Sequence, residues 1–428
     1  MRTTQAVILI TISACGTLGF AQQGGRAGSQ TTSAKQQQQS PSERKYARED
    51  KSFAVNVVRS ATAIQGLESQ DRLRVLSGAA SVISSMRPDL AKAYSREGLR
   101  IEQDLIQRGE SPVVSIIDSG PVNCAAVVSL VENVPAQRVN AAEQTIIGGV
   151  TRCPQSLPAA QQLIVTGLDQ NSIAPRAVLA VMEKTGISSA WSQDQFEKLF
   201  ASLPSNTKDS AREAPNFAAM YARVSLLINK DASQRNGLEL LDWLGKLDPS
   251  GSRNLALNIT TGAMKSALGD KAYEGALASD ALAQQMAQTA GQPAQVEHTP
   301  EENASVLQAM SGQGTDRSAQ LRAMPPSRRA REAAASGFAE GTGGDRKLAQ
   351  SYFRIAFSAL DDLWKERESH PDVHAVIQEV SEAAAQVDPV DALKRTQQLG
   401  DPAAQAIGMI AVARVVASQP DTLSAKAR

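Results

Sequence analysis

The chain is poor in aromatic residues. Of its 428 residues, 4% are Phe, Trp or Tyr, although 42% are hydrophobic. Ala, Leu and Val must therefore fill most of the interior, and alanine has the highest helix propensity of all residues. A β-sandwich of this length would contain more aromatic and β-branched residues, and no stretch alternates apolar and polar residues with a period of two. The composition predicts an all-α fold.

Long apolar runs and an excess of one charge are also missing. After the first 21 residues, no segment approaches the roughly 20 consecutive apolar residues that a membrane span requires. The 44 basic residues balance 44 acidic ones, so the chain lacks the positive potential of a general nucleic-acid binder. We therefore expect no membrane span there and no nucleic-acid partner.

Familiar catalytic motifs are absent as well. The sequence has no GxSxG elbow, and only three histidines could serve as a base. His370 and His374 are four residues apart, but Pro371 stands where a zincin motif needs Glu. Residues 341–344, Gly-Thr-Gly-Gly, lack the spacing of a phosphate-binding loop. We predict no catalytic residue, no metal site and no cofactor.

Acidic pairs are candidate catalytic groups, because secreted all-α enzymes that cleave sugars use two carboxyl groups. The pairs at positions 301–302 and 361–362 lie at helix ends, where acidic side chains usually act as caps or solvated charges. The three tryptophans fall within amphipathic helical patterns, which predict core packing rather than a sugar-binding cleft: Trp191, Trp243 and Trp364. An enzyme acting on envelope carbohydrate remains an alternative.

The first 21 residues have the pattern of a secretory signal peptide. Arg2 precedes an apolar run over residues 6–20, and Ala21 supplies the small residue before a cleavage site. In the alternative, residues 12–15 resemble a bacterial lipobox that would leave a lipid anchor on Cys15. We expect an exported protein, periplasmic or extracellular, or an outer-membrane lipoprotein in the alternative.

Cleavage after residue 21 would leave two cysteines, Cys124 and Cys153. An even number fits a disulfide in an oxidising compartment. Residues 125–132 and 139–150 have the pattern of consecutive antiparallel helices, so the two cysteines should lie at the same end of one hairpin. Two buried thiols are the alternative.

Composition divides the chain into five segments. Residues 22–45 are rich in Gly, Ser and Gln and predict a disordered leader, and residues 299–302 form a capping box that predicts one short helix within a polar stretch. The expected segments are a signal peptide over 1–21, the leader over 22–45, a helical array over 46–290, a flexible linker or insertion over 291–345 and C-terminal helical repeats over 346–428.

Prolines punctuate the C-terminal segment at a regular interval. They precede helical patterns at positions 371, 389, 402 and 420, and the interval from 371 to 402 equals that from 389 to 420. Such a period is expected when each unit is a helical hairpin.

One stretch resembles the tetratricopeptide (TPR) family. Gly337, the turn at 344–345, Ala349, Phe353 and Ala356 match that family's spacing of small and aromatic residues. The resemblance implies a helix–turn–helix in which the alanines allow close contact and the phenylalanine fills the hairpin core. It also implies an α-solenoid of degenerate TPR-like units.

The sequence departs from the TPR pattern in two places. Asp361 stands near the position of the family's proline. Gly262 and residues 269–270 repeat the first half of the pattern, but Glu274 occupies the position of an alanine. The resemblance is therefore confined to about residues 333–362.

The densest group of positive residues consists of Arg322, Arg328, Arg329 and Arg331. One interpretation is docking to an anionic partner, such as an acidic protein face, lipid headgroups or a polyanionic glycan. The other is a solvated linker and helix face. Taken together, the sequence favours a noncatalytic exported helical-repeat protein that binds another protein or a peptide in the cell envelope. A secreted all-α enzyme and a self-associating structural component are the alternatives.

Overall fold

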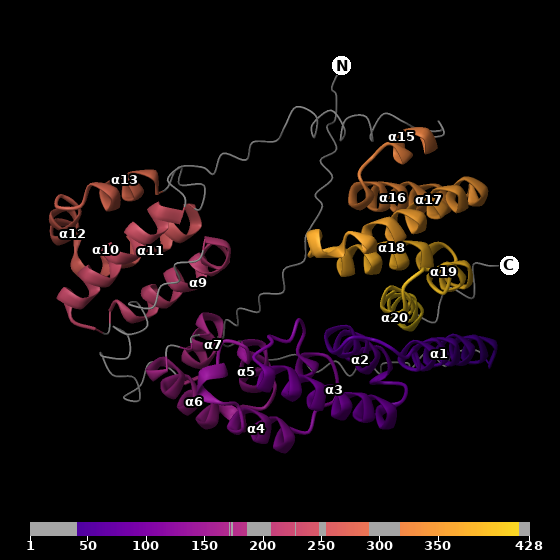
Figure 1. Cartoon of the computed structure of the whole chain (residues 1–428), viewed down its shortest axis with the longest axis horizontal. Coiled ribbons are helices and arrows are strands. Elements are labelled where there is room, and N and C mark those ends of the chain that lie inside the picture. Colours follow the sequence, from indigo (N-terminus) through magenta and orange to yellow (C-terminus); the bar gives the residue numbers. More distant parts are fainter. Residues whose placement is uncertain are drawn as a thin grey trace, which may run out of the picture. The chain divides into compact units, whose positions relative to one another are not determined.

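The computed structural model describes residues 41–170, 172, 174–185, 207–226, 228–247, 254–290 and 317–418. These ranges contain 18 α-helices and no β-strand, which confirms the all-α prediction (Figure 1). The expected signal peptide, the lipobox at Cys15 and the short helix after position 299 lie outside the described residues. Within them, no helix is both long enough and apolar enough to cross a membrane.

The first seven helices cover residues 41–185. They are α1 (Pro41–Thr62), α2 (Ser69–Ile83), α3 (Pro88–Arg108), α4 (Cys124–Glu132), α5 (Glu143–Arg152), α6 (Leu157–Asp169) and α7 (Pro175–Thr185). The 3-10 turn η1 (Ile116–Asp118) stands between α3 and α4. Helix α1 begins at Pro41, so residues 41–45 are helical rather than part of the predicted leader.

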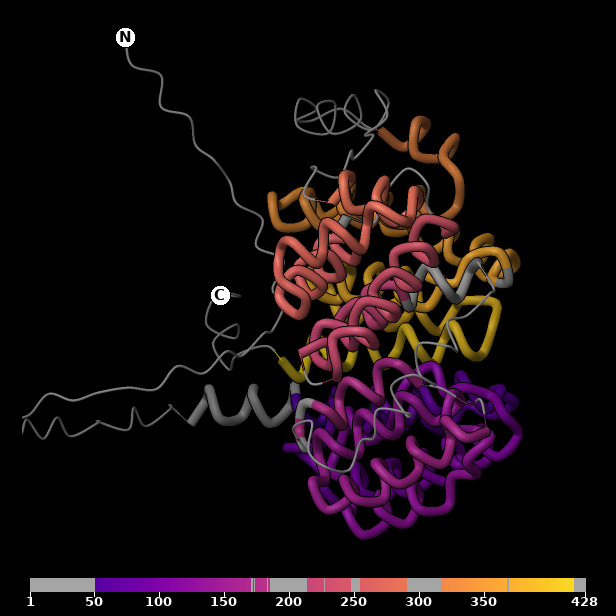
Figure 2. Tube along the Cα trace, turned by 90° about the vertical axis from the view of Figure 1, so that its left-hand side faces the viewer, coloured from indigo at the N-terminus to yellow at the C-terminus, as the bar shows by residue number. Residues whose placement is uncertain are grey.

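Among the described residues, five helices follow in the middle of the chain and six form its C-terminal part. Figure 2 draws the middle helices in pink to salmon and the C-terminal ones in orange to yellow. The middle helices are α9 (Thr207–Val224), α10 (Lys230–Leu247), α11 (Asn254–Leu268), α12 (Asp270–Leu277) and α13 (Ala281–Thr289). The C-terminal helices are α15 (Ser318–Arg322), α16 (Pro326–Gly343), α17 (Arg346–Lys365), α18 (Val373–Val387), α19 (Pro389–Thr396) and α20 (Pro402–Ser418).

Local sequence accounts for several helix ends. Pro389 and Pro402 occupy the first positions of α19 and α20, where the missing N–H of proline costs no hydrogen bond. The carboxylate of Asp388 caps α19 by accepting hydrogen bonds from the backbone N–H groups of Val390 and Asp391. Proline punctuation therefore coincides with these two helix starts.

Helix α16 lies inside the segment 291–345 that the sequence assigned to a flexible linker. Its residues Ala330, Ala333, Ala334 and Gly337 are buried at helical spacing, and the alanines belong to a hydrophobic core. The stripe is narrow and the opposite face carries several arginines, so the mean composition is that of a polar linker. The helices of the C-terminal part therefore include α16 and begin before residue 346, the start predicted from the sequence.

The largest hydrophobic core draws on both ends of the described chain. Side chains of α1 and α2, such as Val58 and Ile83, belong to the same buried cluster as Phe353, Trp364 and Ile407. A second cluster joins residues from α3 through α13, and Trp243 packs there against the ring of Phe217. The two described tryptophans are thus core residues, as the periodicity predicts.

Candidate functional site

A polar pocket of about 210 Å³ lies where α2, the η1 region, α18 and α20 meet. It combines two arginines, several hydroxyl groups, one amide and a few aliphatic side chains. We call it the two-arginine pocket, and its lining residues are Arg74, Val75, Ser77, Gly78, Ser81, Val114, Ser119, Gln378, Ile407, Ile410 and Arg414.

The close approach of α2 and α20 depends on Gly78. A Cβ atom at this position would lie 2.6 Å from Cγ2 of Ile410, which is too close for any unstrained contact. Helix α20 is apolar and buried on most sides, and Arg414 is its one charged residue. Gly78 therefore allows α2 and α20, which carry Arg74 and Arg414, to pack directly against each other.

The two arginines differ in their surroundings. Nη1 of Arg414 donates a hydrogen bond to Oε1 of Glu382 at 2.8 Å, and both side chains are partly exposed. Arg74 is half-buried, and its Nε is fully buried without a hydrogen-bond partner. Burial lowers the pKa of the Arg74 guanidinium from its ordinary value, while the Asp71 carboxylate acts in the opposite direction. Because the ordinary value is so high, the group remains charged at neutral pH.

The acid nearest to Arg74 along the helix already has another partner. Oδ1 of Asp71 lies 3.0 Å from Nε2 of His374, which links α2 to α18. The imidazole also packs edge-on against Trp364, with 5.4 Å between ring centroids. In the sequence, His374 stood out only through its spacing from His370, which does not fit a zincin motif. In the structure, His374 joins α18 to α2 beside the pocket.

The four arginines singled out in the sequence do not form one free positive patch. Arg329 pairs with Asp362 at 2.6 Å, and Arg331 pairs with Asp372 and Glu379. The backbone carbonyl of Arg322 accepts a hydrogen bond from Arg329. These contacts tie α16 to α17 and α18.

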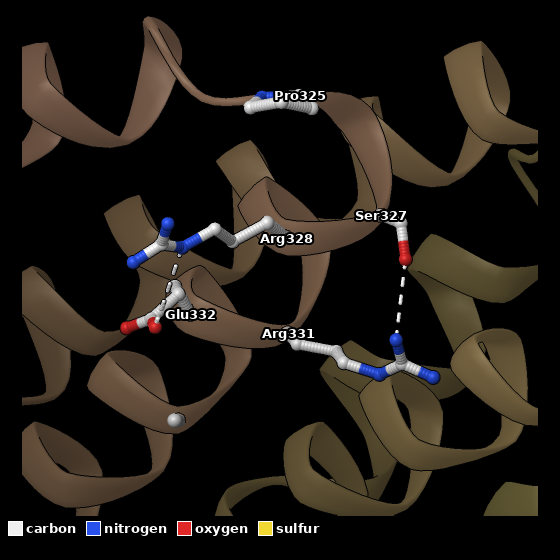
Figure 3. Close-up of a pocket in the computed structure, with 6 residues that line it drawn as sticks. Pro325, Ser327, Arg328, Arg331 and Glu332 are labelled. Atoms are coloured by element: carbon white, nitrogen blue, oxygen red, sulfur yellow. Dashed lines mark hydrogen bonds and ion pairs between the residues drawn. The ribbon is translucent and has the colours of Figure 1, made fainter. Parts of the chain in front are cut away.

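Arg328 and Arg331 line a wider surface pocket of about 490 Å³ (Figure 3). Arg328 lies 4.0 Å from Glu332, one turn further along the same helix. Arg331 also donates to the hydroxyl of Ser327. The guanidinium groups here are thus matched by carboxylates of the chain itself.

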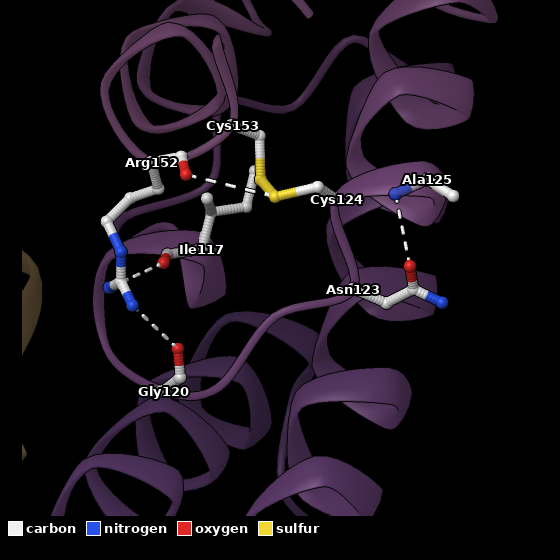
Figure 4. The surroundings of a disulfide bond; sticks show 7 residues. All are labelled: Ile117, Gly120, Asn123, Cys124, Ala125, Arg152 and Cys153. Atoms are coloured by element: carbon white, nitrogen blue, oxygen red, sulfur yellow. Dashed lines mark hydrogen bonds between the residues drawn. A yellow bond between two sulfur atoms is a disulfide. The ribbon is translucent and has the colours of Figure 1, made fainter. Parts of the chain in front are cut away.

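Cys124 and Cys153 form a disulfide, with a Cα–Cα distance of 5.3 Å (Figure 4). Cys124 begins α4 and Cys153 follows α5, which is the arrangement the sequence suggested for a bonded pair. Beside it, the guanidinium of Arg152 donates to the backbone carbonyls of Ile117 and Gly120. Arg152 thus holds the η1 segment against α5, while the disulfide joins the start of α4 to the end of α5.

A fully buried carboxyl group, Glu102 on α3, lies in the same region. It accepts hydrogen bonds from the Ser115 hydroxyl at 2.8 Å, the Ile116 backbone N–H at 3.1 Å and the Thr145 hydroxyl. Burial raises its pKa to about 7, and the three hydrogen bonds oppose that shift. With no exposed surface, Glu102 cannot contact a substrate, and we assign it a structural role.

The acidic side chains at positions 361 and 362 bind other groups of the chain itself. Asp361 accepts a hydrogen bond from the backbone N–H of Gly400, and Asp362 pairs with Arg329. Burial, followed by the charge of the neighbouring Asp280, raises the pKa of Asp242. The sequence missed this pair because Asp242 lies on α10 and Asp280 caps α13. Residues 301–302 lie outside the described ranges.

Among the described residues, no group of three or more His, Cys, Asp or Glu side chains is placed to hold a metal ion. Comparison with protein-family models, with curated proteins and with solved structures gives no significant match to this chain. Function must therefore be argued from the residues themselves.

Proposed function

We propose that this protein is a noncatalytic helical-repeat scaffold of the cell envelope that binds another protein or a peptide. The observation that supports it best is the hairpin of α16 and α17. Helical hairpins stacked in sequence make extended surfaces, and repeat proteins use such surfaces to bind partners.

The hairpin's geometry explains the residues that resemble the TPR pattern. A Cβ atom at Gly337 would lie 3.0 Å from the ring of Phe353, so the glycine allows the two helices to cross closely. Gly344 ends α16 with a left-handed φ of 102°, which favours glycine. Asp345 then caps α17 by accepting from the Leu348 N–H. Ala349 and Ala356 are buried at the interface.

The following helices continue this packing. Helix α18 contacts both α16 and α17, and it packs in turn against α19 and α20. Two large apolar side chains remain exposed on this part of the chain, Phe338 on α16 and Val390 on α19. A disulfide between Cys124 and Cys153 accords with an oxidising compartment. We therefore propose an α-solenoid-like surface on α16–α20 as the partner-binding region.

Site-directed photocrosslinking in the native envelope tests the proposal. A photoreactive residue would replace Val390, which is 67% exposed, and in a matched control Leu255 on α11, which is 66% exposed. We expect reproducible capture of one protein from position 390 and not from 255, identified by mass spectrometry. Capture of nothing would contradict the proposal, and capture of only a second copy would favour the self-associating alternative.

A further inference from the structure

We infer that the two-arginine pocket binds a carboxylate presented by an acidic segment of the partner protein. This inference rests on the proposed scaffold function and names the chemistry of one anchoring site. The Nε atom of Arg74 is buried and donates no hydrogen bond. Buried donors in native proteins nearly always have an acceptor, because an unmet one is costly.

The positive charge at this place is only partly balanced by the protein. Glu382 engages Nη1 of Arg414, and Asp71 is hydrogen-bonded to His374. Neither Glu382 nor Asp71 is part of the pocket lining, so the lining carries two guanidinium groups and no carboxylate. An anion that enters the pocket would therefore find two cationic residues and no acidic residue in its lining.

The size of the pocket limits the ligand. Its volume of about 210 Å³ corresponds to roughly seven water molecules at about 30 Å³ each. That space accepts the end of a Glu or Asp side chain, or a C-terminal carboxylate, but not a nucleotide or a disaccharide.

The lining also matches the shape of an acidic side chain. Arginine offers parallel N–H groups that fit the two oxygens of a carboxylate. The Gln378 amide and the Ser81 hydroxyl supply further polar atoms, while Val75, Ile407 and Ile410 can contact the methylene groups. A phosphate would satisfy the arginines equally but would leave these aliphatic side chains without an apolar partner.

The first experiment needs no variant. The full-length protein, with ¹⁵N-labelled arginine, would be titrated with N-acetylglutamate amide, and separately with inorganic phosphate and with N-acetylglutamine amide. We expect saturable shifts of the Nε–H resonances of Arg74 and Arg414 with the glutamate compound, in the millimolar range for so small a ligand. Equal shifts with the neutral glutamine compound, tighter binding of phosphate, or no shift would each overturn the carboxylate assignment.

Variants then assign the site. Arg74→Gln and Arg414→Gln should each weaken binding of N-acetylglutamate amide at least tenfold. Arg87→Gln is the matched control, because Arg87 pairs with Asp89 on an exposed surface outside the pocket, and it should leave binding unchanged. Unaltered binding in both pocket variants would overturn the inference.

The two proposals fail separately. If N-acetylglutamate amide binds as expected but crosslinking from position 390 captures no protein, the pocket assignment stands and the scaffold proposal does not. If a partner is captured but the Arg74 Nε–H resonance does not respond, the pocket assignment fails alone.

Discussion

The hydroxyl of Thr145 on α5 donates a hydrogen bond to the carboxyl group of Glu102 on α3, 43 residues earlier in the chain. The contact is completely buried, and it makes the interface of these helices sensitive to the protonation of one group. Burial is the dominant influence on Glu102 and raises its pKa from 4.5 to about 7. Between these values the folded state binds a proton that the unfolded state has released.

Stability should therefore fall as pH rises from about 4.5 to 7, because deprotonating Glu102 is harder in the folded protein. A shift of this size corresponds to on the order of 3 kcal/mol. Glu102→Gln should remove this part of the pH dependence, since its carbonyl can accept from Ile116 N–H while its amide donates to the two hydroxyls. Denaturant unfolding of both proteins at pH 5 and pH 8 measures the difference, and parallel pH profiles would refute the assignment.

Reduction of the Cys124–Cys153 disulfide should destabilise the protein. The bond closes a loop with a sequence separation of 29, and the chain-entropy relation gives roughly 3–4 kcal/mol for a loop of this length. The comparison is urea unfolding of the wild type and the double variant Cys124→Ser/Cys153→Ser. Reductant should lower the unfolding midpoint of the wild type and leave that of the double variant unchanged.

The close crossing of α16 and α17 predicts different effects at two glycines of one helix. Gly337→Leu should cost about 1–3 kcal/mol, because the added side chain would displace the Phe353 ring. Gly343→Ala is the control, since its Cβ would meet nothing within 4 Å, and it should be neutral or slightly stabilising. Thermal unfolding followed by circular dichroism distinguishes them. Equal losses at both positions would contradict the packing described for this hairpin.

The arginines of α16 should contribute to stability unequally. Arg329, whose side chain is 18% exposed, pairs closely with Asp362, and Arg329→Ala should cost about 1 kcal/mol. Arg328 is more exposed and lies at the limiting distance from Glu332, so Arg328→Ala should have almost no effect. Chemical denaturation in low and high salt tests both, and a larger loss for the Arg328 variant would reverse this interpretation.

The sequence predicted the helical class and the α16–α17 hairpin because both depend on local patterns. Scarcity of aromatic residues indicated close-packed helices, and the spacing of Gly337, Ala349 and Phe353 described contacts between neighbours in the chain. Helix α16 begins within the segment predicted as a linker, since its buried small residues alternate with arginines in the sequence. Local composition could not distinguish that narrow stripe from a solvated segment.

The two-arginine pocket could not be predicted in the same way. Arg74 and Arg414 come from distant parts of the sequence, and nothing in either segment indicates its partner. Buried apolar residues are spread around most of the circumference of helix α20, so its periodicity points to no particular neighbour. The packing of α2 against α20, with α18 and the η1 region beside them, brings the lining residues together.

That pairing also has a consequence for the order of folding. Asp71 on α2 and His374 on α18 are 303 residues apart, and the same core contains side chains from α1, α2 and α20. Chains are synthesised from the N-terminus, so the part of α2 that packs against α20 is covered only after the residues up to α20 have been made. Closing so long a loop slows folding more than it reduces stability. We therefore expect the residues of α2 that pack against α20 to stay exposed until α20 has been synthesised.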